Sequence, residues 1–214
     1  ITPSGIAYLV MELLQGHTLA EELNTQKRIP VTRALEIIIP VCNVLAQAHE
    51  SGIIHRDIKP DNIFIHKTTE AEIVKVVDFG IAKLAGDTFN MELSKLTGTG
   101  TLVGTPTYMS PERLSNKAYD GKSDVYSLGV VLYEMISGYP PFESFDDNIW
   151  ALINMHLVEE PTPLSSILLD VPLAVDNTIL KTLFKAPEER PTAHQLSIEL
   201  MAVLSSLTAQ TQTK

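Results

Sequence analysis

Two short polar motifs constrain the fold and the chemistry of this chain more than any other feature. Residues 55–62 read HRDIKPDN, and residues 78–80, which begin sixteen positions after Asn62, read DFG. A short β-like segment separates the motifs, so two carboxylates, a carboxamide and an ammonium would stand on two loops at its ends. This mixture suits phosphoryl transfer, because oxygen ligands hold Mg²⁺, a lysine neutralises phosphate charge, and a carboxylate accepts the proton of the acceptor hydroxyl.

The two motifs together are far more specific than either alone, because Asp and Gly are common in ordinary turns. On these residues the chain resembles the protein kinase superfamily, in which a catalytic loop ending in Asn is followed by Asp-Phe-Gly. The resemblance runs to the C-terminus and points to the serine/threonine branch, especially its bacterial members. It implies an α+β, mainly α-helical fold: a kinase large lobe with short β-strands around the catalytic loop and an edge strand left over from the small lobe.

The resemblance also implies a domain organisation. We expect residues 1–207 to hold the hinge and the C-terminal lobe, with the N-terminal lobe absent, and residues 208–214 to form a polar tail. No glycine-rich loop, strand lysine or helix glutamate precedes the expected hinge. The chain alone is therefore expected to bind nucleotide weakly and to turn over little.

Roles for the motif residues follow from the same resemblance. Asp57 would orient the acceptor hydroxyl and accept its proton, and Lys59 would meet the γ-phosphate of ATP. Asn62 and Asp78 would hold the Mg²⁺ (or Mn²⁺) ions that bridge the phosphates. Thr105 would hydrogen-bond to both Asp57 and Lys59.

A nucleotide site against the hinge is implied as well. Met11 would guard the back of the site, and backbone groups of Glu12 and Leu14 would pair with adenine. Phe64 would form the floor, with Val77 also contacting the nucleotide. Taken alone, residues 6–12 would favour an ordinary edge strand.

Residues 81–103 form a long stretch rich in Gly, Thr, Ser and Asp, bracketed by the DFG motif and by GTPTYMSPE at 104–112. In kinases this bracket marks the activation segment. Arg56 is a candidate receiver for a phosphate on this segment, because phosphate opposite arginine can order a loop. The candidate phosphosites are Ser94, Thr97, Thr99 and Thr101.

Three further residues are expected to support the site without taking part in chemistry. Glu112 and Arg190 resemble the buried ion pair that ties the activation segment to the late helices of kinases. Asp124 resembles the residue that braces the backbone of the catalytic loop.

Several helices can be predicted from local signals. Thr18 and Glu21 form a capping box that opens a helix ending near Gln26, and Pro30 opens a longer apolar one. Residues 123–135 are apolar nearly all round, as in a buried central helix that stops at Gly138. Residues 145–207 read as three amphipathic helices.

Composition narrows the possible partners. The net charge is −10 with no cluster of Lys and Arg, which argues against nucleic-acid binding. A single cysteine, Cys42, excludes disulfides within the chain and favours a reducing compartment. The apolar runs at 37–45 and 128–136 are too short or too interrupted to span a bilayer, so no membrane contact is expected from this segment. We expect a cytoplasmic location, with the cytosolic part of a membrane-anchored protein left open.

The sequence therefore predicts an ATP-dependent kinase that phosphorylates Ser and Thr hydroxyls of proteins and autophosphorylates its activation segment. Dimerisation for autophosphorylation is left open. The alternative of the same fold is a pseudokinase or scaffold that only binds partners. A small-molecule kinase is disfavoured by residues 104–112, which in protein kinases seat the peptide.

Overall fold

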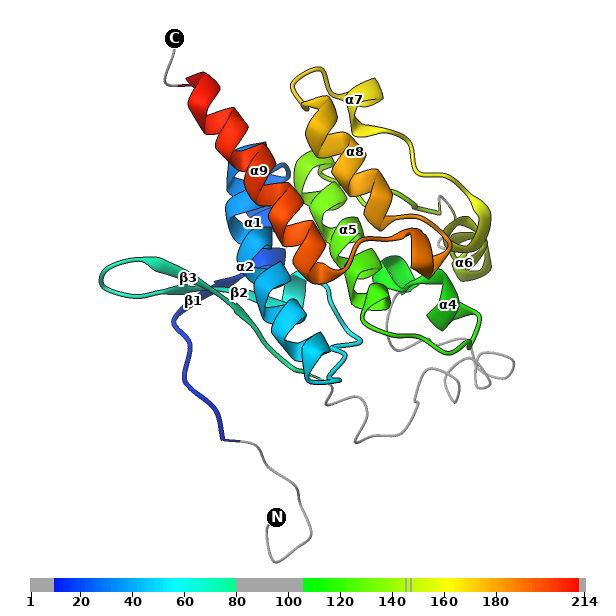
Figure 1. The fold of residues 1–214 in the computed structure, drawn as a ribbon, viewed down its shortest axis with the longest axis horizontal. Helices are drawn as coiled ribbons and strands as arrows, with labels where there is room; N and C mark the ends of the chain where they lie inside the picture. The colour runs from blue at the N-terminus through cyan, green and yellow to red at the C-terminus, as the bar shows by residue number, and fades with distance from the viewer. Residues whose placement is uncertain (1–9, 80–105, 145, 147, 212–214) are drawn as a thin grey trace, which may run out of the picture.

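The structure is a computed structural model that describes residues 10–79, 106–144, 146 and 148–211 (Figure 1). Helices dominate, and a small sheet lies at one side. The strands are β1 (Gly16–Thr18), β2 (Ile63–Lys67) and β3 (Glu72–Val76). The α-helices are α1 (Leu19–Gln26), α2 (Val31–Glu50), α4 (Pro111–Leu114), α5 (Lys122–Ser137), α6 (Ile149–Val158), α7 (Leu164–Ile167), α8 (Leu173–Thr182) and α9 (Ala193–Thr211). The prediction of a mainly helical α+β fold is confirmed.

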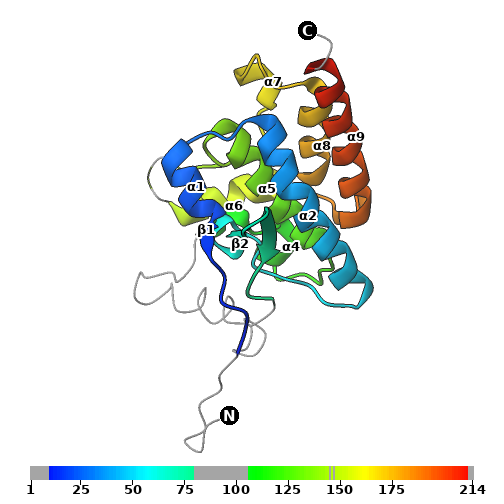
Figure 2. The same ribbon diagram turned by 90° about the vertical axis from the view of Figure 1, so that its left-hand side faces the viewer.

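Helix α5 is the centre of the core. Its side chains are buried on nearly every face, as its sequence predicts, and it packs against α2 and α8 (Figure 2). At its C-terminus Gly138 adopts φ 91° and donates its N–H to the carbonyl of Glu134 at 2.8 Å, which ends the helix as expected. Gly129 lets α8 approach closely, since a Cβ there would lie 1.8 Å from the hydroxyl of Thr182.

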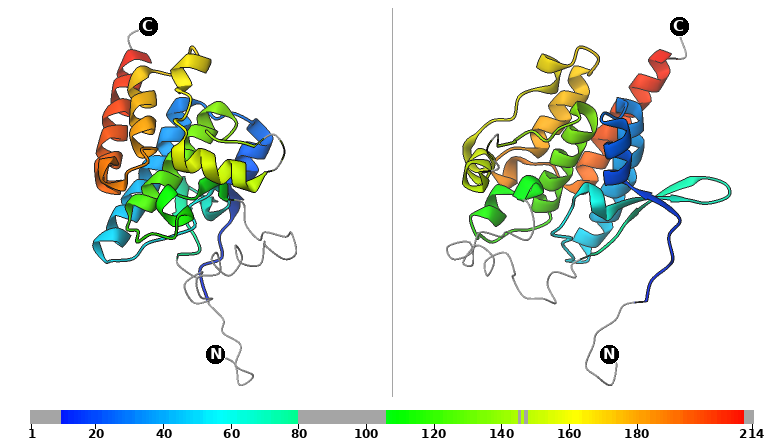
Figure 3. Two further views of the ribbon diagram at one scale, coloured as in Figure 1. Left: turned by 90° about the vertical axis from the view of Figure 1, so that its right-hand side faces the viewer. Right: turned by 180° about the vertical axis from the view of Figure 1, so that it is seen from behind.

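Helix α2 is the other long core element. Within the described residues it is long and apolar enough to cross a membrane by length and composition alone. In the structure it packs against both α5 and α9 (Figure 3). Leu35, Ile38 and Leu45 are among its fully buried residues. Packing in the protein core accounts for this composition.

The sheet is antiparallel in the order β1-β2-β3. Strands β2 and β3 form a hairpin in which Ile63 pairs with Val76 and Ile65 with Val74, and His17 of β1 pairs with Ile65. The edge strand expected over residues 6–12 is not found in its described part, because residues 10–12 are not in a strand. A strand needs a neighbouring strand for its backbone hydrogen bonds, and residues 10–12 have none in the described part of the chain.

The C-terminal region differs from the expectation in two details. Besides the three expected helices, a single turn, α7, forms where Asp176 of α8 accepts the N–H groups of Leu164 and Ser165 at 2.9 and 3.0 Å. Helix α9 also continues to Thr211, beyond the predicted start of the polar tail at Thr208. The Thr208 hydroxyl donates to the carbonyl of Leu204 at 3.1 Å, so a polar side chain here bonds within the helix.

Candidate active site

The loop at residues 55–62 connects α2 to β2 and is fixed at its C-terminal end by a 3₁₀ turn, Pro60–Asn62. The N–H of Asn62 donates to the carbonyl of Lys59 at 3.0 Å, and the carbonyl of Asn62 accepts the N–H of Val77 at 3.0 Å. Because Val77 directly precedes Asp78, this second bond places the DFG motif beside the end of the loop.

Three of the predicted site residues contact one another on this loop. The amide nitrogen Nδ2 of Asn62 donates to the backbone oxygen of Asp57 at 2.7 Å and to its Oδ2 at 3.0 Å. The ammonium of Lys59 lies 3.0 Å from the same Oδ2. The Asp57–Lys59 pair is largely exposed, so it contributes little to stability and can be opened by a ligand.

Buried His55 joins the loop to the DFG motif. Its Nε2 donates to the carbonyl of Val77 at 2.9 Å, and its Nδ1 accepts the N–H of Asp57 at 3.2 Å. Its ring packs edge-on against Phe79 with centroids 4.6 Å apart. Donation by one ring nitrogen and acceptance by the other fix a neutral tautomer, and the two motifs are held at one place.

Asp124, at the start of α5, binds the backbone of the loop through hydrogen bonds. Its Oδ2 accepts the N–H of His55 at 2.8 Å, and its Oδ1 accepts the N–H of Arg56 at 2.9 Å. Oδ2 also accepts a hydrogen bond from Nε2 of His49 at 2.8 Å. These contacts hold Arg56 at φ 72°, a left-handed conformation that residues other than glycine rarely adopt.

The amide oxygen of Asn62 and the carboxylate of Asp78 are ligand types that suit a divalent cation such as Mg²⁺. Because Nδ2 of Asn62 is committed to Asp57, the amide oxygen Oδ1 of Asn62 is available as a ligand. The carboxylate of Asp78 is exposed, and φ 63° at Asp78 sets its backbone in the left-handed region. Among the described residues no group of three or more His, Cys, Asp or Glu could hold a metal ion. Two oxygen ligands completed by phosphates and water are what Mg²⁺ typically takes.

The comparison with known families identifies the fold around this geometry. The family model described as "Protein kinase domain" matches residues 2–199. The chain belongs to the protein kinase family. The resemblance inferred from the two motifs is thereby confirmed.

Named relatives of this kinase chain are bacterial. It is 43% identical over 204 residues to "Serine/threonine-protein kinase PknB" of Mycolicibacterium smegmatis, covering 94% of this chain and 31% of the relative. The protein of the same name from Mycobacterium tuberculosis is 40% identical, with the same coverage. "Probable serine/threonine-protein kinase PknB" of Corynebacterium glutamicum is 38% identical over 202 residues, covering 92% of this chain and 30% of the relative. The kinase chain spans about a third of the length of these relatives.

The predicted hinge residues that the structure describes lie beside the sheet and contact its strands. The carboxylate of Glu12 contacts Lys75 of β3 at 2.8 Å, and Gln15 accepts the N–H of Lys67 at 2.7 Å. The Lys75 ammonium lowers the pKa of Glu12.

Met11 is exposed, while Leu14, Phe64 and Val77 are half-buried. Phe64 lies on β2 opposite Lys75, directly after Ile63. The hinge segment is thus tied to the β2–β3 hairpin, which continues into both catalytic motifs.

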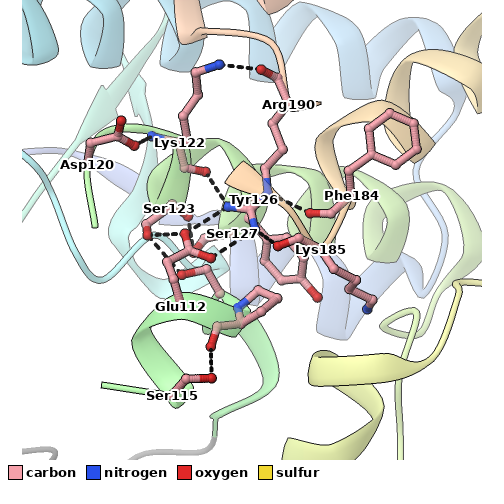
Figure 4. Close-up of polar contacts among 12 residues, drawn as sticks. Glu112, Ser115, Asp120, Lys122, Ser123, Tyr126, Ser127, Phe184, Lys185 and Arg190 are labelled. Carbon is pink, nitrogen blue, oxygen red and sulfur yellow. Dashed lines mark hydrogen bonds and ion pairs between the residues drawn. The ribbon is translucent and has the colours of Figure 1, made fainter. Parts of the chain in front are cut away.

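The structure joins Glu112 of α4 to Arg190 in a buried ion pair, and we call the two residues with their bonding partners the Glu112–Arg190 hub (Figure 4). The two carboxylate oxygens of Glu112 accept from Nη1 and Nη2 of Arg190 at 2.8 and 2.9 Å. The remaining guanidinium N–H groups donate to backbone carbonyls of Phe184, Lys122 and Lys185. Burial raises the pKa of Glu112, but hydrogen bonds from Arg190 and Ser123 outweigh it, and the net pKa is lowered.

Five predicted residues cannot be placed. Ser94, Thr97, Thr99, Thr101 and Thr105 lie outside the described residues, so their roles remain predictions.

Three functional contacts were missed by sequence reasoning. His55 belongs to the motif but was given no role of its own, although its Nε2 binds the carbonyl of Val77. The phenol of Tyr108 donates to Glu134 at 2.7 Å, and burial, followed by the neighbouring charge of Glu134, raises the pKa of Tyr108. Arg113, which follows Glu112, donates through Nη1 to the backbone carbonyl of Arg56. No local pattern in the sequence signals the last two contacts.

Proposed function

We propose that this chain is the hinge and large lobe of a protein serine/threonine kinase that transfers the γ-phosphoryl group of ATP to Ser and Thr hydroxyls of proteins. One observation carries the proposal: Asp57, Lys59 and Asn62 contact one another, and Asn62 is bonded to the residue before Asp78. Family membership and relatives named as serine/threonine kinases support it.

In this mechanism Asp57 accepts a hydrogen bond from the acceptor hydroxyl and takes up its proton late in the transfer. Lys59, which lies 3.0 Å from Asp57, turns its ammonium toward the γ-phosphate and neutralises charge there. The bond from Asn62 to the Asp57 backbone keeps the loop in shape while the carboxylate works. Mg²⁺ held by Asn62 and Asp78 would neutralise the phosphates during transfer.

The catalytic residues need a nucleotide beside them, and the hinge side of the lobe is where we place adenine. Backbone groups of Glu12 and Leu14 would pair with the base, and Phe64 and Val77 would contact it from β2 and the segment after β3. The hydrogen bond from the N–H of Val77 to Asn62 would then keep base and phosphate sites at a constant separation.

Activity is proposed to depend on phosphorylation of residues 94–101, with Arg56 as the receiver. The Nε of Arg56 is buried without a hydrogen-bond partner in the described part of the chain, and its guanidinium lies 5.7 Å from the ring of Tyr119. A cation without a carboxylate partner there suits a phosphate dianion. Mass spectrometry of the active protein is expected to find phosphate on Ser94, Thr97, Thr99 or Thr101. Full activity without phosphate in residues 94–105 would contradict the proposal.

The main experiment measures phosphoryl transfer from radiolabelled ATP to the protein itself and to a model protein substrate, with the full-length protein. We expect phosphoserine and phosphothreonine, and a loss of at least about a hundredfold in Asp57→Asn. Asp170→Asn is the matched control, because this exposed aspartate pairs with Arg28, away from the site.

Two results would reject the proposal in different ways. Nucleotide binding without any transfer by the wild-type protein would favour the scaffold alternative. Transfer by Asp57→Asn at the wild-type rate would show that another group orients the acceptor hydroxyl.

A further inference from the structure

The side chain of Arg113 makes a contact that the proposed mechanism does not use. Arg113 lies on the one-turn helix α4, directly after Glu112, and 57 positions after Arg56 in the chain. Its Nη1 nevertheless reaches the catalytic loop and donates to the backbone carbonyl of Arg56. That carbonyl belongs to the peptide group that joins Arg56 to Asp57.

This peptide group needs support because Arg56 has φ 72°. In the left-handed region an L-residue brings its Cβ close to backbone oxygen, and a long side chain such as arginine gains no local hydrogen bond there. Asp124 holds the N–H of Arg56 at 2.9 Å, on the N-terminal side of the strained residue. Arg113 holds its carbonyl, so the backbone is fixed on both sides of Arg56.

The surroundings of Arg113 indicate that this position is maintained against unfavourable electrostatics. Arg56 and Arg113 both lie 5.7 Å from the ring centroid of Tyr119, which brings two guanidinium groups to one aromatic side chain. Burial lowers the pKa of Arg113, and the charge of Arg56 lowers it further, while Tyr119, Asp124 and Asp57 favour the cation. Within the described residues Arg113 makes no ion pair with a carboxylate.

We propose that Arg113 is a positioning residue of the catalytic loop: its guanidinium, bound to the Arg56 carbonyl, holds the left-handed turn that presents Asp57 to the acceptor hydroxyl. The inference rests on the proposed kinase function and adds to it a residue outside both motifs. Arg113 does not touch substrate in this scheme, and it acts only through the Arg56–Asp57 peptide.

The experiment compares Arg113→Met, Arg113→Lys and the wild type in the full-length protein, with kcat and the KM for ATP measured at saturating protein substrate. Methionine keeps most of the aliphatic stem but has no donor. We expect kcat to fall about tenfold to a hundredfold, because a displacement of about 1 Å at a reacting group can cost that much. The KM for ATP should stay within about twofold, since the proposed nucleotide contacts are made by other residues.

Arg113→Lys tests whether the donor itself matters. Only one N–H of Arg113 is used on the Arg56 carbonyl, so a lysine ammonium can replace it, whereas lysine could not replace a two-pronged arginine contact. The lysine variant is therefore expected to recover kcat several-fold over Arg113→Met.

Arg28→Met is the matched control for loss of an arginine bond to a backbone carbonyl. Nε of Arg28 donates to the carbonyl of Ile136 at 2.8 Å, away from the catalytic loop. This variant also loses the exposed ion pair to Asp170, so it serves as a control for loss of stability away from the loop, and it should leave kcat unchanged whatever the fall in its melting temperature.

Three outcomes would overturn the inference while leaving the kinase proposal standing: an undiminished kcat in Arg113→Met, a loss confined to KM, or no recovery in Arg113→Lys. An inactive wild-type protein would instead overturn the kinase proposal itself, and the same assay separates the two cases.

Discussion

The Glu112–Arg190 hub and the catalytic loop are both built around charged side chains, yet they treat charge in opposite ways. In the hub the side chains of Arg190 and Glu112 are 0% and 5% exposed, and every N–H of the guanidinium has an acceptor. In the loop Asp57 and Lys59 are 53% and 36% exposed, and Arg56 and Asp78 adopt left-handed backbone conformations. Loss of either partner of the hub should therefore be costly for stability, while the loop keeps exposed groups that the proposed function assigns to substrate and metal.

The strain in the loop is offset by elements that surround it. Asp124 binds two consecutive backbone N–H groups, and His55 binds the carbonyl of Val77. Asp124 and His55 are both buried, so the exposed side chains of Asp57 and Lys59 are attached to a backbone that buried groups hold in place. Stability and chemistry should consequently respond to different substitutions.

Breaking the hub gives the largest expected effect on stability. Arg190→Met leaves the Glu112 carboxylate buried without its partner, and the free energy of unfolding should fall by about 3 to 5 kcal/mol. Urea unfolding of the protein measures this free energy. The double variant Glu112→Leu/Arg190→Met is the control, because removing both charges should recover part of the loss. A double variant as unstable as the sum of the two single variants would show that the two charges do not depend on each other.

Removing a ligand from the loop should instead cost activity alone. Asp78→Gly deletes the proposed Mg²⁺ ligand, while glycine accepts φ 63° without strain. Transfer in the full-length protein should fall at least about a hundredfold, or about 3 kcal/mol in the activation barrier. The free energy of unfolding should stay within about 1 kcal/mol of the wild type. A large drop in stability would remove the distinction between the two regions.

Acid should weaken the hub. The pKa of Glu112 is lowered in the folded state, so its contribution to stability is present above its ordinary value of 4.5 and is lost as pH falls through the folded pKa. Urea midpoints measured between about pH 6 and pH 3 should decrease, and Glu112→Leu/Arg190→Met should show a smaller decrease.

The pKa of Glu134 is shifted in the opposite direction to that of Glu112, so its effect on stability should have the opposite pH dependence. Burial raises the pKa of Glu134, although the hydrogen bond from Tyr108 acts against this. Its contribution is therefore fully present below 4.5 and is lost as pH rises through its folded pKa. In Glu134→Gln the decline of stability on that side should become shallower. An unchanged profile would argue against a raised pKa.

The smallest effect is expected where the same kind of ion pair is exposed. Lys181 and Glu199 join α8 to α9 at 3.0 Å, with side chains 49% and 37% exposed. Lys181→Met should change the free energy of unfolding by less than about 1 kcal/mol, because water and salt screen the pair. A loss as large as that in Arg190→Met would show that burial does not decide the value of an ion pair in this protein.

The parts of the fold that follow from local chemistry could be predicted from the sequence. The Thr18–Glu21 capping box is present, with the Glu21 N–H donating to Thr18 at 3.2 Å, and α5 ends at Gly138 as expected. Motif spacing also predicted that the DFG motif lies close to Asn62, and the hydrogen bond from the Val77 N–H to the Asn62 carbonyl agrees with this. Each of these predictions rests on residues close together in the chain.

The contacts that could not be predicted depend on distant partners. The strand expected over residues 6–12, which is not found at its described residues 10–12, was inferred from local β propensity, and this does not reveal whether a neighbouring strand exists. Arg113 and the carbonyl of Arg56 lie 57 positions apart in the chain and meet only in the folded structure. Tyr108 and Glu134 likewise lie 26 residues apart, and nothing in either local sequence specifies their hydrogen bond.

Val77 holds the two motifs together through its main chain and not through its side chain. Its N–H and its carbonyl bind the two ends of the HRD–N motif, through Asn62 and His55 respectively. Any residue other than proline could supply the same pair of bonds. The two hydrogen bonds that align the motifs thus do not involve the side chain at position 77, so a substitution there could change the proposed nucleotide contact while these bonds are kept.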